Sequence, residues 1–460
     1  MLTRRHALKG ALASLFLPGL SRVARAQGTP PPVVVTLEAD GAWDPSYFCD
    51  PLVDARFTPW QSGHILQAGE VRYAPFRVDT PMPTVYQSLD GQDFFQKHAS
   101  KMVVVNGVDH ETVSHLVGPR VAFTGLTRPG YPSLGALTAG ATAPDAPLAF
   151  MSAGGFVSTE GLVSTTRGDN LTAVRSLLRS NATDPTMPGS RGRYQDDPVH
   201  ELVRTRVRER DSRADLQLVI PREAAFREKL GGARTQAVAQ RMESLAAAFD
   251  AAAAGGTGNA LQQAVRGVLV ALSSGDCVAA HLFTADFDSH SDIDSMNGIT
   301  GHRPSLQALC SGLDLLIDGI LASPALVARG VLVLVSSDFG RTAYNAGRGK
   351  DHWPYTSNMV FALGRAASFV GGGRVVGASS PTGEDGAMLN GLRGRRVKVE
   401  SGRVVVAEDA DPQGFRLRAA HVHHALRDVL SRMGADPGGL FSRFPLNLTP
   451  AAPLPLFAPP

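Results

Sequence analysis

Short Val-rich apolar runs alternate in this chain with longer segments rich in Ala and Leu, and this alternation is the strongest constraint on the fold. The short runs have the length and composition of buried β-strands, whereas apolar residues recur with a helical period in the longer segments. Strands that alternate with helices favour a mostly parallel sheet with helices on both faces. We therefore expect an α/β fold. The predicted strands are 32–38, 101–107, 146–153, 277–285, 330–337 and 357–364, and the predicted helices include 260–272, 305–323 and 420–434.

The chain of 460 residues is long enough for more than one average domain, although large α/β proteins often keep a single core with insertions. We expect one α/β domain over 27–445. Residues 185–255 are rich in Arg, Glu and Ala, which predicts a helical insertion with a solvated charged face. Residues 393–409 are expected to form a β-hairpin, and the Pro-rich tail 446–460 an extended arm on the surface.

The N-terminal segment 1–26 has the features of a twin-arginine signal peptide. Arg4-Arg5 precede a modest apolar stretch, and an A-x-A cleavage motif ends at Ala26. The alternative is an uncleaved anchor. Cleavage predicts a periplasmic or secreted protein whose mature part has no integral membrane span. It would also remove five basic residues and change the formal net charge from +3 to −2, so composition gives no support for a nucleic-acid partner.

Cysteine usage narrows the classes of site that the chain can carry. The three cysteines, Cys49, Cys277 and Cys310, are an odd number and form no C-x-x-C pair. A disulfide framework and a thiolate zinc site both require paired or clustered cysteines. Neither is therefore indicated, and a metal site would have to use oxygen and imidazole ligands.

Acidic residues and histidines follow several of the predicted strands. In an open parallel sheet the carboxyl ends of the strands border the ligand crevice, so these side chains would converge there. A single Asp at a strand end commonly caps a helix or forms a turn. Several carboxylates together repel one another unless a cation or a raised pKa relieves the charge. We therefore predict a divalent metal site, with candidate ligands Asp40, Asp44, Asp288, His290, Asp338 and His352.

Spacing supports part of this ligand set. Asp288 and His290 are two residues apart, so on an extended segment both point to the same side. His352 would reach the same ion from the glycine-studded loop after Asp338, or it could belong to a packed turn. Oxygen and imidazole ligands suit zinc, manganese or iron, whereas an all-oxygen cage suits calcium or magnesium. Arg341 is expected either to bind a substrate oxyanion or to pair with Asp338.

Several motifs lie along the mature chain. They are SDFGRT at 337–342 with Asn345, GKDHW at 349–353, GGGRVVGA at 371–378, FDSH at 287–290, and Ser114-His115 followed by Thr124-Gly125. Together they resemble the bacterial family called domain of unknown function 1501. The resemblance covers most of the mature chain, and 185–255 is the least similar part.

That family is grouped with the alkaline phosphatase and sulfatase superfamily, which implies a parallel α/β sheet and metal-dependent hydrolysis of phosphate or sulfate esters. The resemblance implies that Asp40 or Asp44 is the first ligand, Asp288 and His290 the central pair, and Asp338 and His352 the late ligands. It also implies a catalytic nucleophile, for which Ser114 is the candidate. His115 would then be a further ligand or a proton carrier.

The chain departs from the superfamily pattern at Phe339, where many members have a histidine ligand, and this argues against a two-metal centre. The leading hypothesis is an exported metal-dependent hydrolase acting on a small-molecule or polymer ester. The alternative is a non-catalytic periplasmic or surface protein that keeps the fold and binds a protein partner.

Overall fold

The computed structural model describes residues 30–78, 84–144, 148–168, 244–252, 258–296, 301–383, 390–450 and 452–458, with residue 146 and short pieces between 193 and 209. The predicted signal segment lies outside the described residues, as does most of the predicted insertion at 185–255. Within that insertion, residues 244–252 are helical.

The described residues contain an eight-stranded sheet in the order β12-β4-β11-β8-β1-β7-β5-β6. Every neighbouring pair is parallel except those that β11 forms with β4 and β8. The predicted α/β fold is therefore confirmed. The strands are β1 (Val33–Ala39), β4 (Met102–Asp109), β5 (Phe150–Ser152), β6 (Thr165–Arg167), β7 (Ala279–Thr284), β8 (Val331–Ser337), β11 (Tyr355–Leu363) and β12 (Arg374–Val376).

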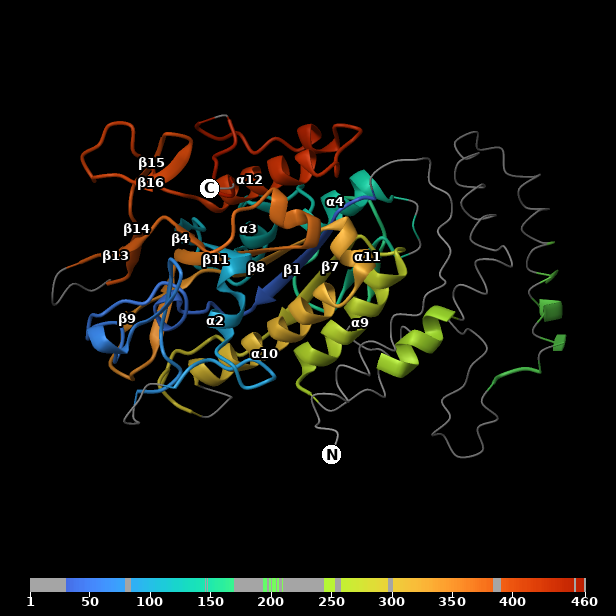
Figure 1. The fold of residues 1–460 in the computed structure, drawn as a ribbon, viewed down its shortest axis with the longest axis horizontal. Helices are drawn as coiled ribbons and strands as arrows, with labels where there is room; N and C mark the ends of the chain where they lie inside the picture. The colour runs from blue at the N-terminus through green and yellow to red at the C-terminus, as the bar shows by residue number, and fades with distance from the viewer. Residues whose placement is uncertain are drawn as a thin grey trace.

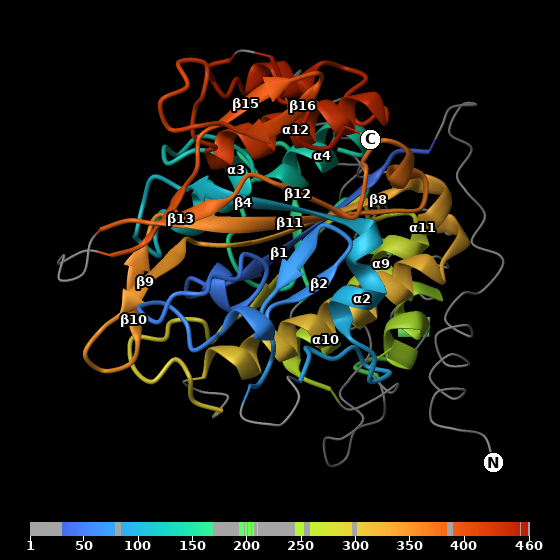
Figure 2. The ribbon, with the colours of Figure 1, turned by 60° about the vertical axis from the view of Figure 1, so that its left-hand side comes forward.

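Helices cover both faces of this sheet, as Figure 1 and Figure 2 show. Alternate residues of β1 enter different cores, with Val33 and Val35 on one side and Val34 on the other. This is the pattern of a strand buried on both faces. One face carries α2 (Phe94–His98), α9 (Ala260–Ser274), α10 (His302–Leu321) and α11 (Pro324–Arg329), and the other carries α3 (Gly118–Thr124), α4 (Leu134–Thr142) and α12 (Ala419–Arg432).

Residues 338–354 form a hairpin where the sequence predicted a loop. Strands β9 (Gly340–Tyr344) and β10 (Lys350–Trp353) pair antiparallel and place His352 opposite Arg341. The late hairpin is present as β15 (Val397–Glu400) and β16 (Arg403–Val406). Shorter elements are β2 (Leu66–Ala68) with β3 (Val71–Tyr73), β13 (Ser379–Pro381) with β14 (Leu392–Gly394), and the 3-10 helices η1 (Pro45–Tyr47), η2 (Ser62–His64), η3 (Ala99–Lys101), η4 (Gly364–Ser368) and η5 (Leu440–Arg443).

The Pro-rich tail is more than a surface arm. Leu454, Leu456 and Phe457 are buried and join the core beneath α12. The tail also accepts a hydrogen bond at the Phe457 carbonyl from Gly371 N. The apolar residues between its prolines therefore anchor the tail, which the Pro content alone did not reveal.

Helix α10 is the one helix in the described part of the chain that is long and apolar enough to cross a membrane, and 67 % of its most apolar window is buried inside the molecule. It packs on the sheet as a core helix. Its buried Asp314 accepts hydrogen bonds from Lys97 Nζ at 2.6 Å, His98 Nε2 at 2.7 Å and the Leu89 N–H at 2.8 Å. Burial raises the pKa of Asp314, but these donors lower it further, to about 2.

This network predicts a pH-dependent contribution to stability. A carboxyl whose folded pKa lies below its unfolded value stabilises the protein above the unfolded pKa and loses that effect as the pH falls. We expect Asp314→Asn to lower the free energy of unfolding at pH 6 by about 1 kcal/mol. The difference from the wild type should shrink between pH 4 and pH 2 in urea titrations. Asp318→Asn, which removes a more exposed partner of Lys97, is the matched control, and an equal effect of both variants would contradict this assignment.

Candidate metal centre

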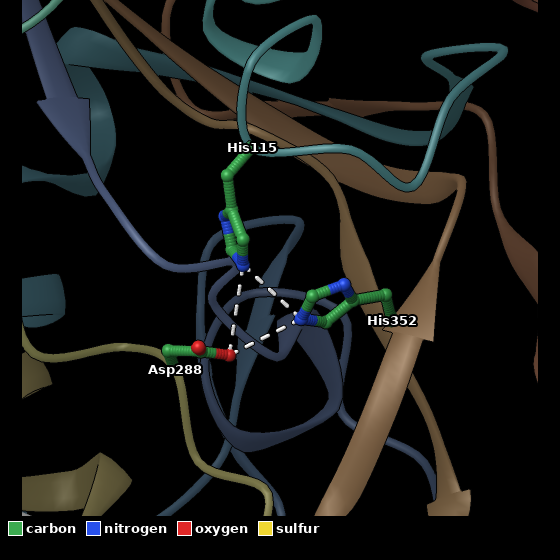
Figure 3. Close-up of side chains that lie close together, drawn as sticks. All are labelled: His115, Asp288 and His352. Carbon is green, nitrogen blue, oxygen red and sulfur yellow. Dashed lines mark hydrogen bonds and ion pairs between the residues drawn. The ribbon is translucent and has the colours of Figure 1, made fainter.

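Three side chains from distant segments point at one another beyond the carboxyl ends of the strands, as Figure 3 shows. His115 lies on the loop between β4 and α3, Asp288 on the loop after β7, and His352 on β10. Their ligand atoms all lie within 4.8 Å of one another. The parallel strands thus deliver their following loops to one edge of the sheet, where a ligand crevice is expected.

His290 brings a fourth donor atom to this cluster. The Nε2 atom of His352 lies 3.1 Å from Nε2 of His115 and 2.9 Å from Nε2 of His290. Asp288 Oδ1 lies 3.2 Å from His352 Nε2, 3.1 Å from His290 Nε2 and 3.7 Å from His115 Nε2. The four donor atoms therefore form two triangles that share the edge between Asp288 and His352.

The other nitrogen of each imidazole already has a partner. Nδ1 of His115 contacts Asp338 Oδ2 at 2.6 Å, and Nδ1 of His290 contacts Asp351 Oδ1 at 3.0 Å. Nδ1 of His352 lies 3.1 Å from the Val113 carbonyl, which can only accept a hydrogen bond. A neutral imidazole with its proton on Nδ1 can donate a hydrogen bond to each of these oxygens. In that tautomer the Nε2 atom carries a lone pair that faces the centre of the cluster. Such outer hydrogen bonds are typical of histidines that bind metals.

Charge in the cluster favours a cation at its centre. Burial raises the pKa of Asp288, but the hydrogen bond and the positive charge of Arg341 lower it to about 2, so the carboxylate is ionised at neutral pH. Burial lowers the pKa of His352, which disfavours protonation of that ring. Three lone pairs and a carboxylate oxygen at these distances repel one another unless a cation lies between them. The donor set therefore fits a divalent metal ion.

Asp338 lies behind His115 rather than among the four donor atoms. It is fully buried; its Oδ1 accepts from the N–H groups of Gly41 at 3.1 Å and Ala42 at 3.4 Å, and its Oδ2 faces His115. The hydrogen bond to Asp338 raises the pKa of His115. Asp338 is thus placed to orient the imidazole of His115, and its predicted role as a ligand stays a prediction, because it also belongs to a second group with Asp40 and His115.

Asp40 and Asp44, the two candidates for the first ligand, lie in different surroundings. Asp40 forms a second group with His115 and Asp338, with ligand atoms within 4.8 Å of one another. Burial and the charge of Asp338 raise the pKa of Asp40 to about 6. Asp44 instead accepts from Ser46 N at 2.9 Å as the cap of η1 and pairs with the buried Lys350. The structure therefore brings Asp40 to His115 and Asp338 and leaves Asp44 in a separate ion pair with Lys350.

Ser114 and Arg341 have roles in the local structure. The exposed Ser114 hydroxyl accepts a hydrogen bond from Leu116 N at 3.3 Å. Arg341 is fully buried and donates to the carbonyls of Ala42, Gly41, Phe287 and Lys350, as well as to Asp288 Oδ1 at 2.7 Å. The expected ion pair with Asp338 is therefore an ion pair with Asp288, and the guanidinium is directed at the chain itself.

Phe339 lies beneath two of the imidazoles. Its ring centroid is 4.9 Å from that of His115 and 4.7 Å from that of His352, and its side chain is fully buried. The sequence singled out Phe339 only as a missing ligand. The pairing of β9 with β10 places His352 above Phe339 and Asp351 beside His290. The sequence pattern did not predict this pairing, so it did not reveal these contacts or the contact of His352 with the Val113 carbonyl.

Two glycines allow the loops to approach closely enough. Gly41 has a φ of +104°, and a Cβ there would lie 2.5 Å from Asp288 N. A Cβ on Gly118 would lie 2.6 Å from the Asp338 Cβ. A side chain at either position would push apart segments that carry a donor or its orienting group.

Comparison with known families agrees with these motifs. The family model described as protein of unknown function (DUF1501) matches residues 79–388, which include His115, Asp288, His290 and His352. This chain belongs to the DUF1501 family. Asp40 and Asp44 precede the matched residues. Among curated proteins, none matches this DUF1501 chain.

A buried ion pair fixes the β9–β10 hairpin of this DUF1501 protein. Lys350 and Asp44 are both buried and in direct contact, and the ammonium lies 4.8 Å from the ring centroid of Tyr47 and 5.1 Å from that of Tyr344. Burial lowers the pKa of Lys350, and Asp44 opposes this effect. The pair ties β10, and therefore His352, to the segment after β1.

Breaking this pair should be costly because it leaves one charge buried without a partner. We expect Lys350→Met to lower the free energy of unfolding by about 3–5 kcal/mol. The double variant Lys350→Met/Asp44→Asn should recover a large part of that loss, which urea unfolding at pH 7 would measure. Lys398→Met, which removes a surface lysine paired with Asp411, is the control with no expected change. Equal losses in the single and double variants would contradict the proposed coupling.

Proposed function

We propose that this protein is a metal-dependent hydrolase of phosphate or sulfate esters. In this proposal the ion is held by Nε2 of His115, His290 and His352 together with Asp288 Oδ1. The observation that carries it is the convergence of these four donors while every outer imidazole nitrogen is already engaged. The resemblance of the family motifs to the alkaline phosphatase and sulfatase superfamily supports the choice of ester.

Exposure of the donors supports a catalytic role over a purely structural one. The side chains of Asp288, His290 and His115 are 49 %, 47 % and 35 % exposed. Structural metal sites are usually closed by protein ligands, whereas catalytic sites keep a position open to water or substrate. A half-open centre at the crevice of a parallel sheet fits the second class.

The bound ion would polarise the ester and lower the pKa of the attacking hydroxyl. The chain's own residues would hold the geometry. Asp338 keeps the ring of His115 in its tautomer, and Arg341 keeps Asp288 oriented and ionised. Asp40, whose raised pKa is about 6, can accept or donate a proton near neutral pH beside His115. Ser114, next to His115 in the chain, remains the proposed nucleophile.

The donor set favours some metals over others. Three imidazoles and one carboxylate suit zinc, manganese or iron, whereas calcium and magnesium prefer oxygen ligands. We propose one of the first three as the resident ion. The proposed setting is the periplasm or the cell exterior, reached by twin-arginine export with cleavage after residue 26.

A non-catalytic binding or assembly protein is the second candidate. The observation that favours it is the position of Arg341, whose guanidinium donates to four carbonyls of the chain rather than toward the open side of the cluster. In that case the ion would stabilise a surface that binds a protein partner. Both candidate functions predict a bound metal ion, but only the hydrolase predicts turnover of an ester.

Metal content and turnover together test the proposal. We expect about one ion per chain in protein purified without chelator and almost none in Asp288→Asn/His352→Ala. Asp338→Asn should weaken metal affinity by roughly 10- to 100-fold, because it removes the group that orients His115. Elemental analysis, metal competition and panels of aryl phosphates, phosphodiesters and sulfates are the measurements. His424→Ala on α12 is the control; metal-loaded protein that turns over no ester would contradict the hydrolase and favour the second candidate.

Ser114→Ala tests the proposed nucleophile separately. The variant should keep its metal content, because the Ser114 hydroxyl contacts only the local backbone in the described structure. Its kcat should fall by at least about a hundredfold if the hydroxyl attacks the ester. Ser442→Ala, at an exposed serine of η5 outside this loop, should leave kcat nearly unchanged. A fully active Ser114→Ala protein would show that Ser114 is not the nucleophile.

A further inference from the structure

The loop that carries His115 also exposes two apolar side chains beside the candidate metal centre. Val113 is 47 % exposed, and Leu116 is 84 % exposed, the highest value among the large hydrophobic side chains of the described residues. The Val113 carbonyl contacts the Nδ1 atom of His352, and Leu116 directly follows His115 in the chain. Both residues therefore lie on the backbone segment that carries His115 and contacts the ring of His352.

Local hydrogen bonds hold this loop in place. Glu111 N donates to Asp109 Oδ1 at 2.8 Å, and Ser114 N donates to Thr112 Oγ1 at 3.2 Å. The N–H groups of Val117 and Gly118 both donate to the Ser114 carbonyl, at 2.9 and 2.7 Å. The backbone is thus ordered by its own contacts and does not require Val113 or Leu116 to be exposed.

A single exposed apolar residue on a protein surface is common and needs no explanation. Val113 and Leu116 are two exposed apolar side chains within four residues, and their loop also provides the His115 donor atom. This combination calls for an explanation. Apolar surface held beside a polar centre is typical of ligand sites, where a few polar groups fix the head of the ligand and apolar side chains contact the rest.

We propose that Val113 and Leu116 form an apolar contact surface for the organic group of the substrate, which is then a phosphate or sulfate ester of an apolar alcohol or phenol. This inference rests on the proposed function, because the anionic head of the ester has to bind at the metal centre. Val113 and Leu116 are placed for this role by the loop that they share with His115, and the Val113 carbonyl contacts the ring of His352. A purely polar ester, such as a sugar phosphate, would gain nothing from it.

The test uses non-hydrolysable n-alkylphosphonates, from methyl to hexyl, titrated calorimetrically into the full mature chain loaded with one equivalent of zinc. Each methylene that leaves water for an apolar contact strengthens binding by up to roughly fourfold. We expect affinity to rise with chain length in the wild type and to become nearly flat in Val113→Ser/Leu116→Ser. Methylphosphonate affinity and zinc content should not change in Leu116→Ser alone, which leaves the loop residue that contacts His352 intact. Val399→Ser on the exposed face of β15 is the matched control, because Val399 is 46 % exposed.

A flat series in the wild type would overturn the inference, as would a slope that survives in the double variant or a failure of every phosphonate to bind. If instead the double variant changes the oligomeric state and leaves the slope intact, the surface contacts a second copy of the chain and the inference is wrong. Turnover on the ester panel is measured independently. Chain-length-dependent phosphonate binding without turnover would contradict the hydrolase alone, whereas turnover with a flat series would contradict the apolar surface alone.

Discussion

A single buried guanidinium holds together the loops on which the candidate centre depends. Arg341 lies on β9. It donates hydrogen bonds to carbonyls of the loop after β1, of the loop after β7 and of β10. The planar guanidinium offers five donors in a fixed geometry, which suits one residue contacting several segments at once. Its contact with Asp288 Oδ1 then aims the only charged donor of the cluster. These contacts therefore tie together three segments that are far apart in the sequence.

The imidazoles depend on a second set of constraints. Asp338, Asp351 and the Val113 carbonyl each hold one Nδ1, so that the three Nε2 atoms face one point. Phe339 supports the rings of His115 and His352 from below. The centre is therefore pre-formed in the fold, and its repulsive arrangement of lone pairs is stabilised by packing at its base. The proposed cation would relieve this repulsion at a site whose ligands are already oriented by the fold.

The sequence predicted the parts of this arrangement that depend on local pattern. Periodicity located the main strands and helices. Because ligands gather at the carboxyl ends of parallel strands, the sequence alone also predicted that Asp288, His290 and Asp338 lie close together. The β9–β10 hairpin was not predicted because GRTAY and KDHW lack the apolar alternation of a half-buried strand.

The antiparallel direction of β11 follows from its connection to β8. The connection from β8 to β11 contains a hairpin and no crossover helix, so β11 returns antiparallel.

Other features depended on partners far away in the chain. Asp40 and Asp44 both follow the first strand, and what separates them is the cap that Asp44 forms on η1 together with its contact with Lys350, more than 300 positions later. The same holds for Arg341, whose acceptors lie on three different segments. No pattern within a short window encodes such pairs. His115 was weighed as a ligand only through the family resemblance, because its position on a short loop before α3 gives no signal of its own.

X-ray absorption spectroscopy at the metal edge of the protein purified without chelator tests the proposed metal centre most directly. We expect a first shell of about three imidazole nitrogens and at least one oxygen, at roughly 2.0–2.2 Å. The imidazole scattering should decrease in His352→Ala. An all-oxygen shell, or a folded protein that binds no divalent ion, would contradict the assignment of His115, His290, His352 and Asp288 as the metal centre.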